Sequence, residues 1–129
     1  MLRKDSLFRR LVNKHELLDF LVSINFSFLY PEDYSFSEQI SLFGNTKILI
    51  IESGAAMTNI MFCKPGTFVL EINPGDGGVG FWRSFAEANG LRLRTIVGTP
   101  SRYSSLGEFK VDFHEFKRNI QEIINEYYS

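Results

Sequence analysis

The chain has 129 residues, the size of one domain, and we expect a single domain over residues 1–129. Hydrophobic residues make up 44% and charged residues 22% of the sequence, a globular composition that excludes a disordered chain or a coiled coil. A net charge of −1 argues against a nucleic-acid binder, and one cysteine with two histidines argues against a structural metal. No apolar run approaches the ~20 residues that span a bilayer, and the start lacks a signal peptide's apolar stretch, so we expect a cytoplasmic protein with no transmembrane segment.

The first predicted element is a helix that follows a run of basic residues, with no strand before it. Asn13 and Glu16 have the spacing of a capping box, in which the two side chains satisfy backbone N–H groups reciprocally. Apolar side chains then recur at helical spacing as far as Val22. Residues 25–29, which read NFSFL, predict a short strand before a proline turn.

A second helix and a buried strand are predicted next. Ser35 with Glu38 has the spacing of another capping box, and the helix that it begins ends at Gly44. Residues 48–51 read ILII, and such a continuous apolar run is typical of an interior strand of a parallel sheet, buried on both faces. After a turn of small residues, a short helix is predicted over residues 55–62.

The pattern continues with strand, helix and strand. Residues 67–72 predict a second interior strand, which leads into a glycine-rich loop over residues 73–80. A helix over residues 81–89 ends at Gly90, the residue type expected just past a helix C-terminus. Residues 91–97 alternate in character and predict a further strand.

The final predicted helix begins at a third capping box, formed by Asp112 with Glu115. Its apolar side chains, spaced for one buried face, are Phe116, Ile120, Ile123, Ile124 and Tyr127. Helices and strands therefore alternate with short connections throughout the chain. This order predicts an α/β fold of three layers, with a mainly parallel sheet covered by helices on both faces.

The turn after the strand at residues 48–51 is the best candidate for a ligand site. Ligands of open α/β sheets bind at the carboxyl ends of the strands, and here Ser53-Gly54-Ala55-Ala56 leads a strand into a helix. Small side chains let a ligand approach the backbone, and a helix N-terminus favours a phosphate group. The pattern alone fits ordinary close packing of a helix on a strand equally well.

The sequence after this turn resembles the central signature of the family-61 glycosyltransferases. Residues 54–67 read GAAMTNIMFCKPGT and are followed by VLEI, and the family pattern is roughly G-P-H-G-A-G-L-T-N, then P-P-G and a strand ending in E-I or E-L. Residues 3–13 are similar to the family's S-R-x-x-x-x-x-R-x-x-N segment, and residues 37–43, with Phe36 before them, match its S-F-x-E-Q-I/V-x-L-F helix. The resemblance covers about residues 3–73.

The resemblance implies a glycosyltransferase with a two-lobed GT-B architecture. In this family the C-terminal, Rossmann-like lobe holds a nucleotide-sugar, and hexosyl or pentosyl transfer with inversion to a glycan acceptor takes place between the lobes. The chain resembles that lobe alone, so we expect an enzyme that is incomplete by itself. Either the chain is a fragment of a longer protein, or the acceptor lobe lies on another chain or in a homo-oligomer. The implied role is polysaccharide or glycoconjugate synthesis with no cofactor besides the donor substrate.

The implied donor-binding residues are matched one by one. Gly54, Ala55 and Ala56 would supply the helix terminus that binds the diphosphate. Thr58 and Asn59 would bond phosphate or ribose, although both side chains could instead satisfy the local backbone.

Two charged residues complete the implied donor site. Arg10 matches a family arginine and would reach the diphosphate, or else it belongs to a solvated basic face. Glu71, near the end of its strand, would accept hydrogen bonds from ribose hydroxyls, or is an ordinary carboxylate at a strand end.

Two neighbouring positions depart from the family pattern. Ser53 stands where the family has histidine, and Glu52 where it has proline. A serine hydroxyl can donate a hydrogen bond to a phosphate but is no useful base near neutral pH, so the sequence assigns no catalytic residue. The alternative function is a non-catalytic binding or assembly module with a degenerate site, which would use its phenylalanine-rich edge to dimerise or dock.

Other residues with functional chemistry have structural interpretations. His15 and His114 lie near the starts of predicted helices, where solvated polar residues are usual. Cys63 is expected to be a small buried residue. Phe81 and Trp82 could stack on a base or sugar, but at the start of an amphipathic helix we expect them in the core.

Overall fold

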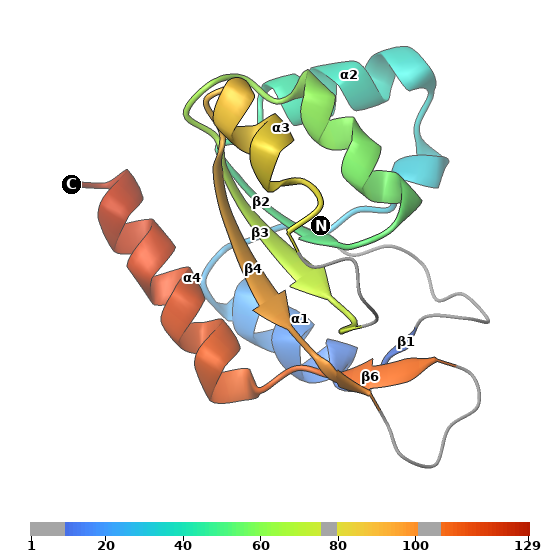
Figure 1. The fold of residues 1–129 in the computed structure, drawn as a ribbon, viewed down its shortest axis with the longest axis vertical. Helices are drawn as coiled ribbons and strands as arrows, with labels where there is room; N and C mark the ends of the chain where they lie inside the picture. Colours follow the sequence, from blue (N-terminus) through green and yellow to red (C-terminus); the bar gives the residue numbers. More distant parts are fainter. Residues whose placement is uncertain (1–9, 76–79, 101–106) are drawn as a thin grey trace.

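The computed structural model describes residues 10–75, 80–100 and 107–129 (Figure 1). Its main sheet has three parallel strands in the order β2-β3-β4. Their bounds are Ile48–Glu52 for β2, Phe68–Asn73 for β3 and Arg92–Val97 for β4. Every residue of the central strand β3 is buried. The α/β class and the parallel sheet predicted from the sequence are confirmed.

Helices cover both faces of this sheet (Figure 1). One face carries α1 (Lys14–Ser23) and α4 (Phe113–Tyr127), which pack on Ile50, Leu70 and Ile72. The other carries α2 (Phe36–Gly44), the 3₁₀ helix η2 (Ala55–Phe62) and α3 (Arg83–Ala88), which pack on Leu49, Ile51 and Val69. Alternate residues of β2 and β3 thus enter two separate cores, as the two-residue period of a strand requires.

Contrary to our prediction, the apolar strand over residues 48–51 is not an interior strand. It lies at the edge of the described sheet, because β3 is the only described strand that pairs with β2. Leu49, Ile50 and Ile51 are nevertheless at most 3% exposed, because helices cover both faces of the strand. The continuous apolar run therefore reports burial by helices and not the number of neighbouring strands. The same expectation is correct for β3, which pairs with β2 and β4.

A second, smaller sheet lies at the carboxyl end of β4 and has no counterpart in the predicted elements. Its order is β1-β6-β5, and its strands are β1 (Arg10–Leu11), β6 (Glu108–Lys110) and β5 (Thr99–Pro100). Because β5 follows β4 after Gly98 alone, the small sheet continues from the end of the main one. The helix α1 is thus preceded by a short strand, contrary to our expectation, and β1 pairs with β6 from the far end of the chain.

The prediction of a strand over residues 25–29 is wrong, because this segment forms no regular element. Asn25 adopts a positive φ of 71°, which reverses the chain at the end of α1. The Phe26 N–H then donates to the Leu21 carbonyl over 2.9 Å, so the backbone closes on its own helix instead of pairing with a strand. A single 3₁₀ turn, η1 (Pro31–Asp33), follows before α2.

Two of the three predicted helix caps are present. Ser35 and Glu38 form the complete capping box of α2, with both reciprocal hydrogen bonds. Asp112 caps α4, since its side chain accepts a hydrogen bond from the Glu115 N–H over 2.8 Å. These short-range contacts depend on residues three apart, so the sequence is sufficient to predict them.

The capping box predicted for Asn13 and Glu16 is wrong. The Asn13 side chain makes no capping hydrogen bond and instead reaches Val111, 98 residues further along the chain. Its Nδ2 donates to the Val111 carbonyl over 2.7 Å, and its Oδ1 accepts from the Val111 N–H over 3.2 Å. An asparagine amide satisfies a backbone donor and a backbone acceptor together, and here it fastens the start of α1 to the segment between β6 and α4.

We therefore predict that Asn13→Ala lowers the free energy of unfolding by about 1–3 kcal/mol, because it leaves both backbone groups of the buried Val111 without their partner. Glu16→Gln is the matched control and should change this free energy by less than about 0.5 kcal/mol, since Glu16 is exposed and Asn13 does not pair with it as a cap. Urea denaturation of the two variants makes the measurement. A larger loss for Glu16→Gln than for Asn13→Ala would restore the capping-box interpretation.

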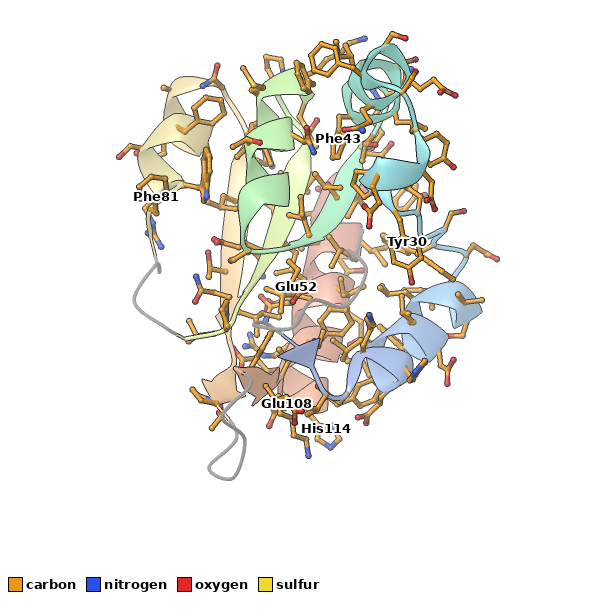
Figure 2. The ribbon with its side chains drawn as sticks, turned by 90° about the vertical axis from the view of Figure 1, so that its right-hand side faces the viewer. Tyr30, Phe43, Glu52, Phe81, Glu108 and His114 are labelled. Carbon is orange, nitrogen blue, oxygen red and sulfur yellow. The ribbon has the colours of Figure 1, made fainter. Side chains whose placement is uncertain are left out.

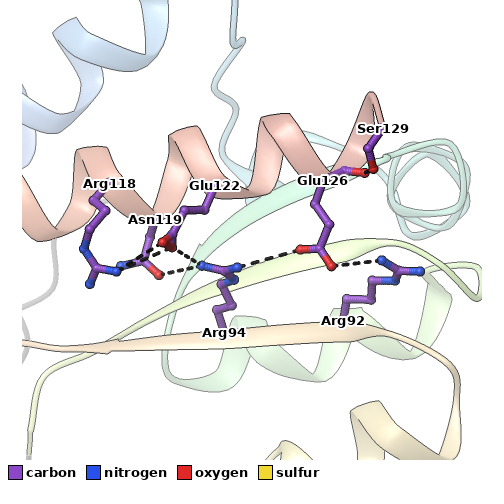
Figure 3. A network of polar contacts seen from close by, with 7 residues as sticks. All are labelled: Arg92, Arg94, Arg118, Asn119, Glu122, Glu126 and Ser129. Carbon is purple, nitrogen blue, oxygen red and sulfur yellow. Dashed lines mark hydrogen bonds and ion pairs between the residues drawn. The ribbon is translucent and has the colours of Figure 1, made fainter.

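A network of arginine and glutamate side chains joins α4 to β4 (Figure 3). Arg94 Nη1 donates to Glu122 Oε2 over 2.7 Å, and Arg92 Nη1 lies 3.2 Å from Glu126 Oε1. Arg118 of α4 is 3.4 Å from the same Glu122 carboxylate. The pairs are partly exposed and screened by solvent, so each contributes little to stability, and the buried apolar face of α4 stabilises its docking far more.

The hydrogen bond from Arg94, with the charges of Arg118 and Arg94, lowers the pKa of Glu122 below its ordinary value of 4.5. A carboxylate whose pKa is lowered by folding stabilises the fold fully above pH 4.5, and this contribution disappears as the pH falls through the folded pKa. Glu122→Gln should therefore destabilise the protein at pH 7 and have little effect at pH 3. Urea denaturation from pH 7 to pH 3 checks this, and an equal effect at both ends would contradict it.

Candidate functional site

The turn between β2 and η2 lies at the carboxyl end of the parallel sheet, where the sequence places the ligand site. The Ser53 N–H donates to the Ile72 carbonyl over 2.8 Å and so extends the ladder of β2 and β3 by one residue. Gly54 then turns the chain, and the Met57 N–H closes the first turn of η2 on the Gly54 carbonyl over 3.0 Å. The buried side chains of Met57 and Ile60 hold η2 on the sheet.

Gly54 has the backbone conformation that makes this turn possible. Its φ is 138° and its ψ is −158°, a region that residues with a side chain rarely adopt. The helix predicted over residues 55–62 has these same bounds but is a 3₁₀ helix, with tighter turns than an α-helix. The backbone of Ala55 and Ala56 begins it, as predicted, and the donor-binding role of these residues stays a prediction.

A chain of three polar side chains, of which Ser53 and Glu71 are buried and Thr95 is half-buried, crosses the sheet beside this turn. Ser53 Oγ donates to Glu71 Oε2 over 2.5 Å, and Thr95 Oγ1 donates to Glu71 Oε1 over 3.0 Å. Glu71 is 1% exposed and Ser53 6% exposed. The Glu71 carboxylate on the central strand thus joins the end of β2 to β4. Its partner on β4, Thr95, stands directly opposite Glu71 in register.

The other predicted donor-binding residues belong to η2 and to the smaller sheet. Thr58 is exposed on η2, and Asn59 beside it is half-buried. Arg10 belongs to β1, which pairs with β6 beyond the carboxyl end of β4 (Figure 1). The structure therefore brings Ser53 and Glu71 together beside the turn and places Arg10 on a different sheet. Contacts of all these residues with a ligand stay predictions.

Sequence reasoning missed several polar residues here that are buried or half-buried. Thr95 completes the bridge to Glu71, yet in the sequence it is only one polar residue in an alternating strand. Asn73 is 1% exposed, and its Oδ1 accepts a hydrogen bond from the Gly75 N–H over 2.8 Å, which shapes the start of the glycine-rich loop. Glu52 is 4% exposed and lies on the opposite face of the sheet from Ser53, near the middle of the molecule (Figure 2). A glutamate directly after four apolar residues was the available signal for this burial.

The remaining candidates lie elsewhere. His15 and His114 are exposed, and His114 lies near Glu108 at the far end of the molecule from α2 (Figure 2). Phe81 is 75% exposed, so our expectation of a core position is wrong for it. Trp82 is partly buried and packs on the core under α3, as expected. Residues 76–79 of the predicted glycine-rich loop lie outside the described residues.

The described parts of the chain hold neither a cluster of metal-ligating side chains nor a membrane-spanning helix. Within residues 10–75, 80–100 and 107–129, no group of three or more histidine, cysteine, aspartate or glutamate side chains could hold a metal ion. No helix in those ranges is long and apolar enough to cross a membrane. The described residues of the turn offer hydrogen bonding by backbone N–H groups, hydroxyls and the Glu71 carboxylate.

Comparison with known protein families gives a match that includes this turn. The family model described as glycosyltransferase 61 matches residues 1–70. These residues include β1, α1, α2, β2, η2 and the first part of β3, and therefore the whole turn at Gly54. No curated protein matches the chain.

Cys63 follows η2 and is 9% exposed, as expected for a small buried residue. Burial raises the pKa of its thiol from 9.0 to about 11, so at pH 8 only about one thiol in a thousand is ionised. We predict that the native protein reacts with a disulfide reagent at least about 100-fold more slowly than the urea-unfolded chain, whose thiol has its ordinary pKa. Cys63 is the single cysteine, so the absorbance change reports on it alone, and similar rates in both states would contradict its burial.

Proposed function

The chain belongs to glycosyltransferase family 61, a family of sugar-transferring enzymes, and from this membership we propose that it binds the nucleotide-sugar donor of an inverting transfer to a glycan acceptor. The observation that carries the proposal is the Gly54 turn. It lies in the segment that the family model matches and stands at the carboxyl end of a parallel strand. That edge is where open α/β sheets bind nucleotides.

The diphosphate of the donor would lie against the backbone of the turn. Its negative charge grows as the bond between sugar and phosphate breaks, so the site must supply hydrogen-bond donors already in place. In a 3₁₀ helix the first backbone N–H groups have no partner within the helix, and those at the start of η2 would serve as these donors. Thr58, which is exposed on η2, would add a hydroxyl, and Arg10 a positive charge.

Ser53 would not act as the base that deprotonates the acceptor. Its hydroxyl proton is directed to Glu71 Oε2, and the residue is 6% exposed. We propose that the acceptor and the catalytic base belong to a second lobe, as in the two-lobed GT-B architecture. Sugar transfer would then contribute to polysaccharide or glycoconjugate synthesis.

The same observation favours one alternative function. Because Ser53 replaces the family's histidine and its proton is held inside the protein, the chain could bind a nucleotide-sugar or a partner without catalysing transfer. Binding of a donor is common to both functions, and transfer by the chain together with its second lobe distinguishes them.

We predict that the chain binds a nucleoside diphosphate and that Gly54→Ala weakens this binding at least about tenfold, since a Cβ at this position enters the space of the phosphate. The measurement is isothermal titration calorimetry with UDP, GDP, CDP and TDP. Circular dichroism first establishes a temperature at which each variant is folded.

Gly66→Ala is the matched control for backbone strain. Gly66 also has a positive φ, of 91°, but it lies before the amino end of β3, and a Cβ there meets nothing within 4 Å. Both variants should lose stability, whereas only Gly54→Ala should lose affinity. Equal affinities of the two variants would mean that the turn is a packing element and not a phosphate site.

A further inference from the structure

Glu71 is held inside the protein by two neighbouring strands. Its two carboxylate oxygens accept hydrogen bonds from Ser53 over 2.5 Å and from Thr95 over 3.0 Å, and the residue is 1% exposed. A carboxylate buried to this degree must be satisfied by the protein itself, and both of its oxygens are.

The bridge fixes the residue from which the ligand turn begins. Ser53 is held by its backbone N–H on Ile72 and by its side chain on Glu71, and Gly54 follows it with its unusual backbone conformation. Gly54 alone has wide conformational freedom, so the turn needs a rigid starting point to hold its N–H groups in place. Ser53, tied to the central strand, provides that starting point.

We propose that Glu71 is a positioning residue, which fixes the Ser53–Gly54 turn for the donor diphosphate and makes no contact with the ribose. This inference rests on the proposed function and assigns a different role from the ribose contact that the family resemblance implies. A ribose contact would require an accessible carboxylate, whereas Glu71 is closed off beneath Ser53 and Thr95.

The hydrogen-bond direction has a consequence for Ser53 as well. A serine hydroxyl has one proton, and here Ser53 Oγ donates it to Glu71. Its oxygen can then only accept further hydrogen bonds, so it cannot donate to a phosphate oxygen. The diphosphate is left to the backbone of the turn, and its binding depends on how firmly Glu71 holds that backbone.

Three variants separate positioning from direct contact. Glu71→Ala removes the bridge. Glu71→Gln keeps one acceptor oxygen and adds an NH₂ group, to which a rotated hydroxyl can be the acceptor, so both links can persist. Val69→Ala is the matched control, because Val69 lies on the same strand and the same face, is fully buried and takes no part in the bridge.

The test is isothermal titration calorimetry of each folded variant with UDP and GDP and with their 2′-deoxy and 3′-deoxy analogues. We expect Glu71→Ala to weaken diphosphate binding at least about tenfold, Glu71→Gln to stay within about threefold of wild type and Val69→Ala to match wild type. The ratio of the affinities for the ribose and deoxyribose forms should be the same in wild type and Glu71→Ala. A ratio that collapses in Glu71→Ala shows a ribose contact and overturns the proposal, as does undiminished affinity of Glu71→Ala.

Hydrogen exchange of the free proteins tests the positioning role without any ligand. Glu71→Ala should accelerate exchange of the backbone amides of residues 53–59 relative to Val69→Ala, while exchange in α1 and α4 stays equal in the two variants. Equal exchange of residues 53–59 in both overturns the positioning role. If wild type binds none of the nucleotides although exchange responds as expected, the donor-binding function fails while the structural role of Glu71 stands.

Discussion

The complete burial of β3 governs where polar groups can stand in this fold. Helices cover both faces of the strand and a parallel neighbour lies along each edge, so no side chain on it reaches solvent. A polar residue placed there must find its partner within the protein, because an unsatisfied buried group costs about 1–3 kcal/mol or more. Glu71 and Asn73 meet this requirement with hydroxyls of the adjacent strands and with a loop N–H. The hydrogen bond that satisfies Glu71 in the core is therefore the same one that holds Ser53 at the start of the ligand turn.

The parts of the fold that the sequence predicts are those set by nearby residues. The caps at Ser35 and Asp112, the three parallel strands and the bounds of η2 all follow from patterns within a few positions. Asn13 shows where this reasoning ends. Its sequence neighbourhood contains a capping partner three residues away, but its side chain bonds to Val111, which no local pattern identifies. The small sheet was missed for the same reason, since β1 and β6 are two and three residues long and gain regular structure only by pairing with each other.

The features of the candidate site also differ in whether nearby or distant residues determine them. A turn of small residues after a buried strand is visible in the sequence, and the structure places it at the expected edge of the sheet. The sequence does not show that Ser53 turns its proton inward or that Thr95 faces Glu71, because both depend on the register of three strands. Residue identity suggested a ribose ligand at Glu71, whereas burial points to an internal role. The chemistry of an acidic side chain is thus decided by its neighbours as much as by its type.

The pairing of β1 with β6 also affects how the chain folds as it is synthesised. The contacts between Asn13 and Val111 close a loop of 98 residues, so β1 finds its partner only after the chain as far as β6 and Val111 has left the ribosome. Contacts of such long sequence separation slow folding, because the entropy of closing the loop is lost before the contacts form. The segment matched by the family model supplies β2 and the first part of β3, and these strands depend on β4, β6 and α4 for their pairing and cover. Synthesis therefore exposes the apolar strands β2 and β3 until β4 and α4 have been made.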